Sequence, residues 1–311
     1  MAKSMKKMLL LAKKEVTPGT DALPAAAANA ILCRALTPEP ITAEQVQRNL
    51  IRPFKGNSGS LTVGEHRKFT FEVELAGAGT AGDEPAWGLL LEACGFAATI
   101  TAGTDVTYDL VSEGEPTLTL YGILDKTQFA ITNAKGTVSF ELNAKAIPVM
   151  KFEFLGTYNV ATELGAMPVD ADYSAFVQPK TVGKANTPTF SFYGLAACTS
   201  AFSVNLANSL AWRELINCAA PHSPDRQPSG SVTMEMPSIT TKNWAEVVRN
   251  STVGACSLVH GTVPGNIVEL AMPAVQCKPF TLQDDQSIAM LNMPFDINPV
   301  DGNDELRIIV R

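Results

Sequence analysis

Charge is scarce in this sequence, and its basic residues are not clustered. The 24 lysines and arginines face 31 aspartates and glutamates, which gives a formal net charge of −7. Charged residues make up 18% of the chain, where about 25% is usual. A protein that reads duplex DNA neutralises phosphates with clustered lysine and arginine. The composition therefore argues against that class, and the low charge predicts that other copies cover part of the surface.

Long apolar runs are also missing. The lysines near the start are followed by only five apolar residues, Met8–Ala12, whereas the core of a secretory signal has about 7 to 15. No apolar run approaches the roughly 18 residues that span a bilayer. We therefore expect a protein that is made in the cytosol and has no membrane partner.

Cysteines and histidines give little sign of a reactive site. Six cysteines in 311 residues are too sparse for a disulfide framework. The pairs Cys218–His222 and Cys256–His260 have a spacing that suggests zinc, but if Cys256–His260 is a strand, its ends lie about 13 Å apart, too far to share one ion. No G-x-S-x-G motif is present to make His66, His222 or His260 part of a hydrolase site. We therefore predict no catalytic, cofactor-binding or metal-binding residues.

A glycine motif between a predicted strand and a predicted helix is the strongest sign of an enzyme. Gly77, Gly79 and Gly82 spell G-x-G-x-x-G, which in a dinucleotide-binding fold lets a pyrophosphate approach a helix N-terminus. The preceding strand carries glutamates on one face, unlike a buried parallel strand. No βαβ series follows, so a flexible loop is the favoured interpretation and nucleotide binding the alternative.

Apolar and polar residues alternate along much of the chain, which predicts strands. The N-terminal segment differs: residues 1–44 are rich in alanine, proline and threonine and are predicted to form an irregular N-terminal arm. Residues 45–159 are predicted to form a β domain, beginning with the strand 68–75. Val138, Phe140 and Leu142, followed after a turn by Met150, Phe152 and Phe154, alternate with polar residues and predict a long β-hairpin.

One short helix is predicted in this first domain. Asp83 can cap it, Pro85 lies in its first turn and Gly95 ends it. Trp87, Leu90, Leu91 and Cys94 form one buried stripe along it, interrupted only by Gly88.

The second half repeats features of the first. Residues 160–186 lose periodicity and are predicted to connect two domains, the second being 187–311. Trp244, Val247 and Val248 repeat Trp87, Leu90 and Leu91 at a constant spacing of 157 residues. Arg213–Ile216 likewise mirrors Arg48–Ile51. An internal duplication follows, with each half mainly β and carrying one helix that covers its sheet. Further strands are predicted at 256–260, 266–270, 287–295 and 306–310.

Six stretches spread over nearly the whole chain carry a family resemblance. They are LLLAKKEVTPGTDALPAAAANAILC (9–33), QRNLIRPF (47–54), GNSGS (56–60), EPAWGLLLEACGF (84–96), DRQPSGSVT (225–233) and GNDELRIIV (302–310). Together they resemble the phage tail tube protein, in the long two-repeat form of the major tail protein found in long-tailed non-contractile phages.

The resemblance implies a structural protein of the virion tail, assembled in the host bacterial cytoplasm, and no enzyme. Each domain would be a β-sandwich or barrel with a flanking helix and a long hairpin. Copies would form stacked rings, and their hairpins would join into a continuous inner β-barrel. The implied partners are other copies, the tape-measure protein, the tail terminator, the baseplate proteins, and phage DNA held in the lumen without specific binding.

Several alternatives stay open. Three two-domain chains would form a pseudo-sixfold ring, which the duplication favours, whereas single-domain behaviour would require six chains. A tail terminator or a baseplate ring protein would share the fold. Glu141 and Glu153, on the predicted hairpin, are the candidates for an acidic lumen that repels DNA, although an ordinary solvated sheet face would also explain them.

Overall fold

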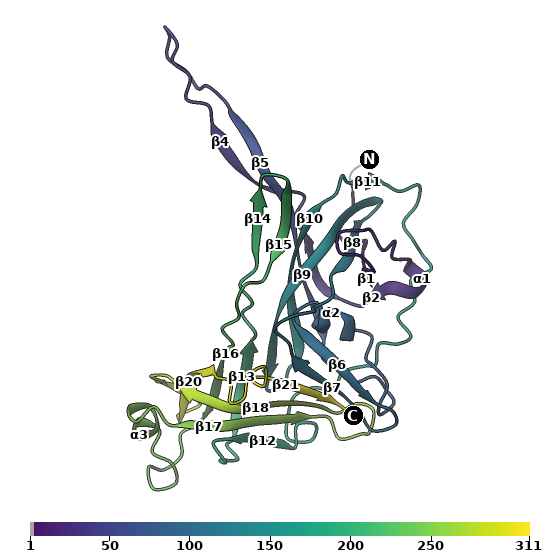
Figure 1. Ribbon diagram of the computed structural model, residues 1–311. Coiled ribbons are helices and arrows are strands. Elements are labelled where there is room, and N and C mark those ends of the chain that lie inside the picture. The colour runs from purple at the N-terminus through teal and green to yellow at the C-terminus, as the bar shows by residue number, and fades with distance from the viewer. Residues whose placement is uncertain (1–2) are drawn as a thin grey trace.

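The computed structural model describes residues 3–311 as a β-rich molecule whose strand pairs are all antiparallel within that range (Figure 1). The strands of the first half are β1 Met8–Lys14, β2 Ala30–Ile31, β3 Arg34–Pro38, β4 Thr42–Gln47, β5 Ser60–Glu74, β6 Phe96–Thr101, β7 Asp105–Leu110, β8 Leu118–Leu124, β9 Thr127–Asn143 and β10 Val149–Tyr158. Those that follow are β11 Thr162–Glu163, β12 Thr189–Phe192, β13 Thr199–Asn205, β14 Ala211–Leu215, β15 Cys218–His222, β16 Ser229–Glu235, β17 Val253–His260, β18 Val268–Cys277, β19 Thr281–Asp285, β20 Ile288–Ile297 and β21 Arg307–Val310. The helices are α1 Ala26–Asn29, α2 Gly88–Glu92 and α3 Trp244–Arg249.

One layer of strands runs through both halves of the chain, and we call it the inner sheet. Its strands lie in the order β3 and β4, β5, β10, β9, β13, β16, β20, β19. The halves meet where β9 pairs with β13, with Glu141 opposite Ser203. The sheet is open, because β3 and β4 form one end and β19 forms the other.

The two halves of the inner sheet repeat the same topology. In the first half a hairpin ending in β5 precedes α2, and β5 then pairs with β10 of the β9–β10 hairpin. In the second half a hairpin ending in β16 precedes α3, and β16 pairs with β20 of the β19–β20 hairpin. The predicted hairpin of 138–142 with 150–154 is therefore confirmed, and the repeat agrees with the duplication read from the sequence.

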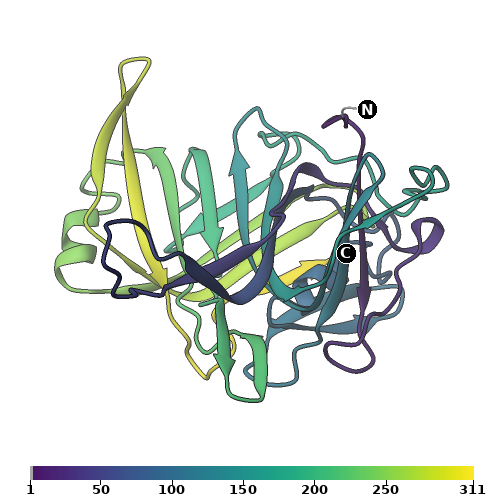
Figure 2. The same cartoon turned by 90° about the horizontal axis from the view of Figure 1, so that it is seen from above.

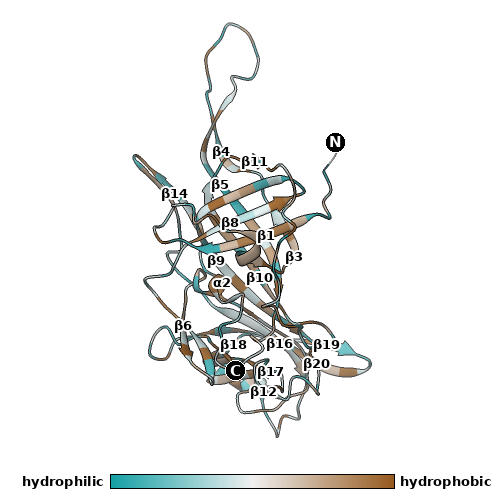
Figure 3. Cartoon of the chain, turned by 90° about the vertical axis from the view of Figure 1, so that its right-hand side faces the viewer, coloured by the Kyte–Doolittle hydropathy of each residue, from teal (hydrophilic) through white to brown (hydrophobic). Residues whose placement is uncertain are grey.

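Alternation along these strands places every second side chain in the core. Phe71, Phe152 and Phe154 stack with ring centroids 5.5 to 6.0 Å apart. Phe202 and Phe295 stack at 6.3 Å in the second half. The alternation is visible as successive brown and teal residues along the strands in Figure 3. A slip of one residue in any pair would move these rings to the polar face, so burial fixes the register.

A second layer covers the core from the other side. Its strands lie in the order β12, β17, β18, β21, β7, β6. The C-terminal strand β21 lies between β18 of the second half and β7 of the first, pairing Ile308 with both Leu270 and Tyr108. The halves are thus joined in both layers.

The helices are shorter than the sequence predicts. The helix expected from Asp83 to Gly95 is helical only over α2, because turns occupy the residues on either side. Gly88 lies where a Cβ atom would come within 2.2 Å of the Tyr108 hydroxyl, so this glycine allows close packing on the sheet. Trp87 and Trp244 are both buried, as the repeated stripe predicts, and Asn243 caps α3 by accepting a hydrogen bond from the Glu246 N–H.

The expected irregular arm over residues 1–44 is wrong within the described part of that segment. β1 pairs with β8 along its whole length, and Leu9, Leu10 and Leu11 are buried. Both faces of its Leu9–Ala12 part are covered, so this part is continuously apolar and has no period-2 signature. Residues 34–47 form β3 and β4, which belong to the inner sheet.

The segment 160–186 is mostly irregular, as predicted, and one histidine ties it to the second half. Buried His260 on β17 contacts the Thr187 hydroxyl through Nδ1 at 2.9 Å and the Lys180 carbonyl through Nε2 at 3.1 Å. Since the carbonyl can only accept, Nε2 carries the proton of the neutral ring. Burial lowers the pKa of His260, and the bond to the Lys180 carbonyl opposes that shift in part.

The stability of the unassembled protein is expected to fall as the pH drops below about 6.5, the ordinary pKa of histidine. Because the pKa of His260 is lower in the folded state, the unfolded chain takes up the proton first as the pH falls. Acidification therefore lowers the free energy of unfolding, by at most about 1.4 kcal/mol per pH unit. Urea unfolding between pH 7.5 and 5.5 measures this. His260→Gln is expected to flatten the dependence and exposed His222→Gln to leave it unchanged; equal slopes in all three proteins would contradict the assignment.

Candidate assembly surface

The face of the inner sheet that points away from the core is lined by half-exposed polar residues. Lys68, Thr70 and Glu72 on β5 lie beside Lys151 and Glu153 on β10. A shallow hollow lies on this face near the junction of the halves, lined by side chains that include Ala35, Thr70, Glu72, Thr137, Ser139, Lys151, Glu153 and Asn205. Backbone alternation places these side chains here, since their neighbours fill the core.

The acidic residues of this face are balanced by lysines. Glu141 and Glu153 both lie on it, where the sequence analysis places them. Glu141 forms an ion pair with Lys151 at 2.6 Å, and Glu153 forms one with Lys68 at 3.1 Å. The hydrogen bond from Lys151 to Glu141 raises the pKa of that lysine, and nearby Glu72, 3.9 Å from Lys151, acts in the same direction.

The second half of the same face carries short polar side chains in its middle and acidic residues toward its ends, Glu235 on β16 and Asp296 on β20, of which Asp296 pairs with Lys278 at 2.6 Å. Ser203, Ser231 and Thr233 occupy the positions on β13 and β16, and the hydroxyls of Ser203 and Ser231 are 2.8 Å apart. Asn292 continues the polar row on β20. The face therefore combines paired charges with short hydroxyl side chains, and it offers phosphate groups no concentrated positive charge.

Two hairpins extend from one end of the molecule, formed by β4–β5 and by β14–β15 (Figure 1). Each carries the repeated Arg-x-Leu-Ile sequence at or near its tip, and the isoleucines Ile51 and Ile216 are fully exposed. The hairpins touch where the rings of His66 and Trp212 stack with centroids 5.4 Å apart. The structure thus presents two exposed aliphatic tips at the same end of the molecule, with the β4–β5 tip farther from the body (Figure 1), a feature that the sequence repeat marked without showing its place.

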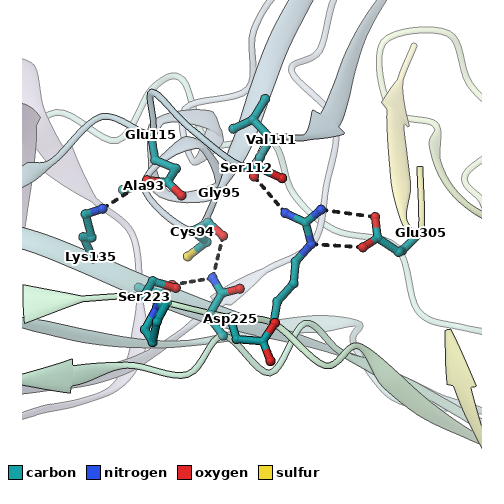
Figure 4. A pocket seen from close by; sticks show the side chains of 14 residues that line it. Ala93, Cys94, Gly95, Val111, Ser112, Glu115, Lys135, Ser223, Asp225 and Glu305 are labelled. Carbon is teal, nitrogen blue, oxygen red and sulfur yellow. Dashed lines mark hydrogen bonds and ion pairs between the residues drawn. The ribbon is translucent and has the colours of Figure 1, made fainter. Parts of the chain in front are cut away.

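A polar pocket lies where the two halves meet, and Figure 4 shows how its side chains converge. Arg226 donates hydrogen bonds to the Glu305 carboxylate at 3.2 and 3.3 Å and to the Val111 carbonyl at 2.8 Å. Asn208 donates to the carbonyls of Cys94 and Gly136 at 2.6 and 2.9 Å. These bonds connect loops of the second half to the first, so the pocket clamps the halves together. Sequence reasoning missed this clamp, because Arg226 entered only as part of the stretch DRQPSGSVT (225–233) that carries the family resemblance.

The glycine motif is used for packing between the halves. The Gly77 N–H donates to Asn266 Oδ1 at 2.8 Å, and the Gly79 N–H donates to the Gly265 carbonyl at 2.8 Å. A Cβ atom on Gly77 would lie 2.2 Å from the Gly265 carbonyl oxygen, and one on Gly265 would lie 2.3 Å from that of Gly79. The two loops therefore need glycine to approach each other. The N–H groups of Gly77 and Gly79 are therefore occupied by protein acceptors, which counts against the nucleotide alternative.

The Cys-x-x-x-His pairs are not brought together as sites. Cys218 and His222 lie at opposite ends of the exposed strand β15. The nitrogens of His260 are occupied by Thr187 and Lys180, although Cys256 lies on the same buried face of β17. Among residues 3–311, no helix is long and apolar enough to cross a membrane.

Comparison with known proteins agrees with this geometry. A search of curated proteins gave no match. The family model described as phage tail tube protein matches residues 6–304, which is nearly the whole chain and includes both repeated halves, the glycine loop and both hairpins. The open β layers with one polar face are consistent with that family's architecture. The chain therefore belongs to the phage tail tube protein family, and it is a structural component of the virion tail.

Proposed function

We propose that copies of this chain join edge to edge into rings, and that the rings stack into the hollow tube through which phage DNA leaves the virion. The inner sheet carries the proposal. It has a buried face, a polar face and two open ends, so joining successive chains at those ends would continue the sheet around a lumen. A closed ring would also remove the unpaired strand edges that otherwise promote aggregation.

The repeated topology favours a ring of three chains. Each chain supplies two similar four-stranded units, and the β9–β13 pairing inside the chain already joins one unit to the next. Three chains would thus give six similar units, whereas six chains would be needed if a chain supplied only one. The domains that support this proposal are 45–159 and 187–311, joined by 160–186. β3 is sheet-forming, so the first unit would extend back to residue 34.

The polar face would line the lumen. Its lysine–glutamate pairs and hydroxyl groups would let DNA slide without the counterion release that strengthens binding to basic surfaces. Stacked rings that grow by repeated contacts need an external length measure. The proposal therefore includes the tape-measure protein in the lumen, the terminator and baseplate proteins at the tube ends, and assembly in the host cytoplasm.

The first test is electron microscopy of the purified protein across a concentration series, with rotational analysis of end-on views. Hollow tubes with threefold averages are expected. Exact sixfold symmetry, with six identical units, would overturn the ring in which each chain supplies two units. Single rings that never extend would favour a terminator or baseplate ring protein, and monomers at every concentration would overturn the assembly proposal.

Charge in the lumen can be tested by Glu141→Lys combined with Glu153→Lys. The double variant removes the closest partners of Lys151 and Lys68 and makes the face basic, so DNA is expected to adhere and phage complementation to fall while tubes still form. Glu113→Lys with Asp170→Lys makes the same change of charge in exposed loops outside the inner sheet and is expected to complement normally. Normal complementation by both double variants would rule out a lumen position for Glu141 and Glu153.

Stacking can be tested at the hairpin tips. Ile51→Asp combined with Ile216→Asp places a charge where each tip would enter an apolar contact, so rings are expected to form and long tubes to be lost. The matched control is Val16→Asp with Val169→Asp, which changes two equally exposed aliphatic residues away from the hairpins. Tube lengths in micrographs provide the measurement, and tubes of normal length from the tip variant would contradict a role in stacking.

A further inference from the structure

The two open ends of the inner sheet have counterparts inside the same chain. At one end, β19 pairs with β20 just as β9 pairs with β10: Gln283 is opposite Met290, and Glu141 is opposite Val149. Since β20 pairs with β16 as β10 pairs with β5, β19 is the topological equivalent of β9. Figure 2 shows the β19–β20 hairpin, in yellow, projecting at one side of the molecule.

At the other end, β3 is the equivalent of β13. Thr37 on β3 is opposite Thr70 of β5, and Ser203 on β13 is opposite Ser231 of β16. Both strands contain a register shift near this point, between Arg34 and Thr37 in β3 and between Thr199 and Ala201 in β13. Leu36 and Phe202 occupy matching positions and are both buried.

Inside the chain, the equivalents of these two free strands are paired with each other. β9 and β13 form an antiparallel ladder from Ser139 opposite Asn205 to Asn143 opposite Ala201. The junction between the halves is therefore a template for a junction between chains. We propose that β19 of one chain pairs with β3 of the next in the same antiparallel register, which places Gln283 opposite Thr37 and Asp285 opposite Ala35. This inference rests on the ring proposed above and specifies its contact.

The backbone groups at both edges suit this register. Pairing with β20 turns the N–H groups of Gln283 inward and leaves those of Leu282 and Asp284 pointing to the open side. On β3 the Glu39 N–H bonds to the Lys68 carbonyl, so the open side carries the N–H of Leu36 and the nitrogen of Pro38. The junction would gain the bonds from Leu282 to Pro38 and between Asp284 and Leu36 in both directions. Proline is compatible with pairing to β5 because its missing N–H faces away from that strand, and at the junction it cannot return a bond to the Leu282 carbonyl, so this position contributes one bond in place of two.

Side chains support a second copy as the partner. Leu282 is 63% exposed, although its equivalent Phe140 is fully buried beside the β9–β13 ladder. Placing β3 of a neighbour against β19 would bring Pro38 opposite Leu282 and shield it. Asp285 at the end of β19 would lie near Arg34, which begins β3 and is half exposed. The pairing would thus shield an apolar residue, Leu282, and bring an acidic residue beside a basic one on the polar face.

A disulfide between adjacent chains tests the register. Thr37 and Gln283 would form a non-hydrogen-bonded pair, whose Cα atoms lie about 4.5 Å apart, within the range of a disulfide, about 4.4 to 6.8 Å. Thr37→Cys with Gln283→Cys is made in a background of Cys198→Ser and Cys218→Ser, since both native cysteines are exposed. Tubes are assembled under reducing conditions and then oxidised. Loss of the monomer band is expected on a non-reducing gel, with the covalent series ending at the number of chains in a ring.

The control pair is Thr37→Cys with Asp285→Cys in the same background. These positions would be diagonal neighbours about 7 to 8 Å apart, so they are expected to remain monomeric. Cross-linking of the diagonal pair in place of the direct pair, or tubes without any cross-link, would overturn the register while leaving the tube function intact. Failure of the wild-type protein to form rings or tubes would instead overturn the function itself.

Hydrogen exchange of the wild-type protein tests the same contact without substitutions. The amides of Leu36, Leu282 and Asp284 are expected to become protected in tubes relative to unassembled subunits. The amide of Gln283, already turned toward β20, serves as the internal control. Unchanged exchange at all three edge amides would overturn the pairing, whether or not the cysteine variants assemble.

Discussion

The antiparallel ladder between β9 and β13 is the interaction on which the rest of the molecule depends. It makes one sheet out of two repeated units, and it fixes the position of the hairpins, the polar face and the free edges relative to one another. The C-terminal strand, the hydrogen bond from Arg226 to the Val111 carbonyl and the two glycine loops reinforce this junction from the opposite layer and from the loops. Because the two units cannot rotate independently, their curvature is passed on to any assembly they form.

In the proposed tube, the polar face would conduct a polyanion without binding it. An acidic surface would repel DNA but would also repel itself across a narrow lumen, and a basic one would retain the genome. Here Lys151 lies between Glu141 and Glu72, so charges of both signs lie close together and partly offset each other. Hydroxyl side chains occupy the middle of the second half. Long-range attraction is low in such an arrangement, while the surface stays hydrated.

Period-2 alternation allowed much of the inner sheet to be predicted. The β9–β10 hairpin and the strand at 68–75 each have one buried and one polar face, and this produces a signal that a single sequence carries. The strand β1 was not predicted, because its apolar part is covered on both faces and shows no period-2 alternation. The ends of the helix predicted from Asp83 to Gly95 were wrong. Gly88 packs closely against Tyr108, and a contact between residues so far apart in the sequence leaves no local signal.

The candidate surface was predicted less completely than the fold. Glu141 and Glu153 were placed on the correct strands, but their lysine partners lie on neighbouring strands, and only the register brings them together. The glycine motif has the spacing of a phosphate-binding loop for a different reason, which is the approach of a second loop 188 residues later, at Gly265 facing Gly77. Arg226 and Asn208 had no pattern of their own, because single polar residues that clamp loops follow no periodicity.

The unequal hairpins have a mechanical consequence for the proposed tube. The two halves carry equivalent arms, yet the β4–β5 arm reaches farther from the body than the β14–β15 arm (Figure 1). A ring of three chains would present long and short arms in alternation. Adjacent rings could then bind each other only in three orientations, one-third of a turn apart. A twist applied at one end of the tail would therefore be transmitted to the other end, because neighbouring rings could not rotate by one-sixth of a turn.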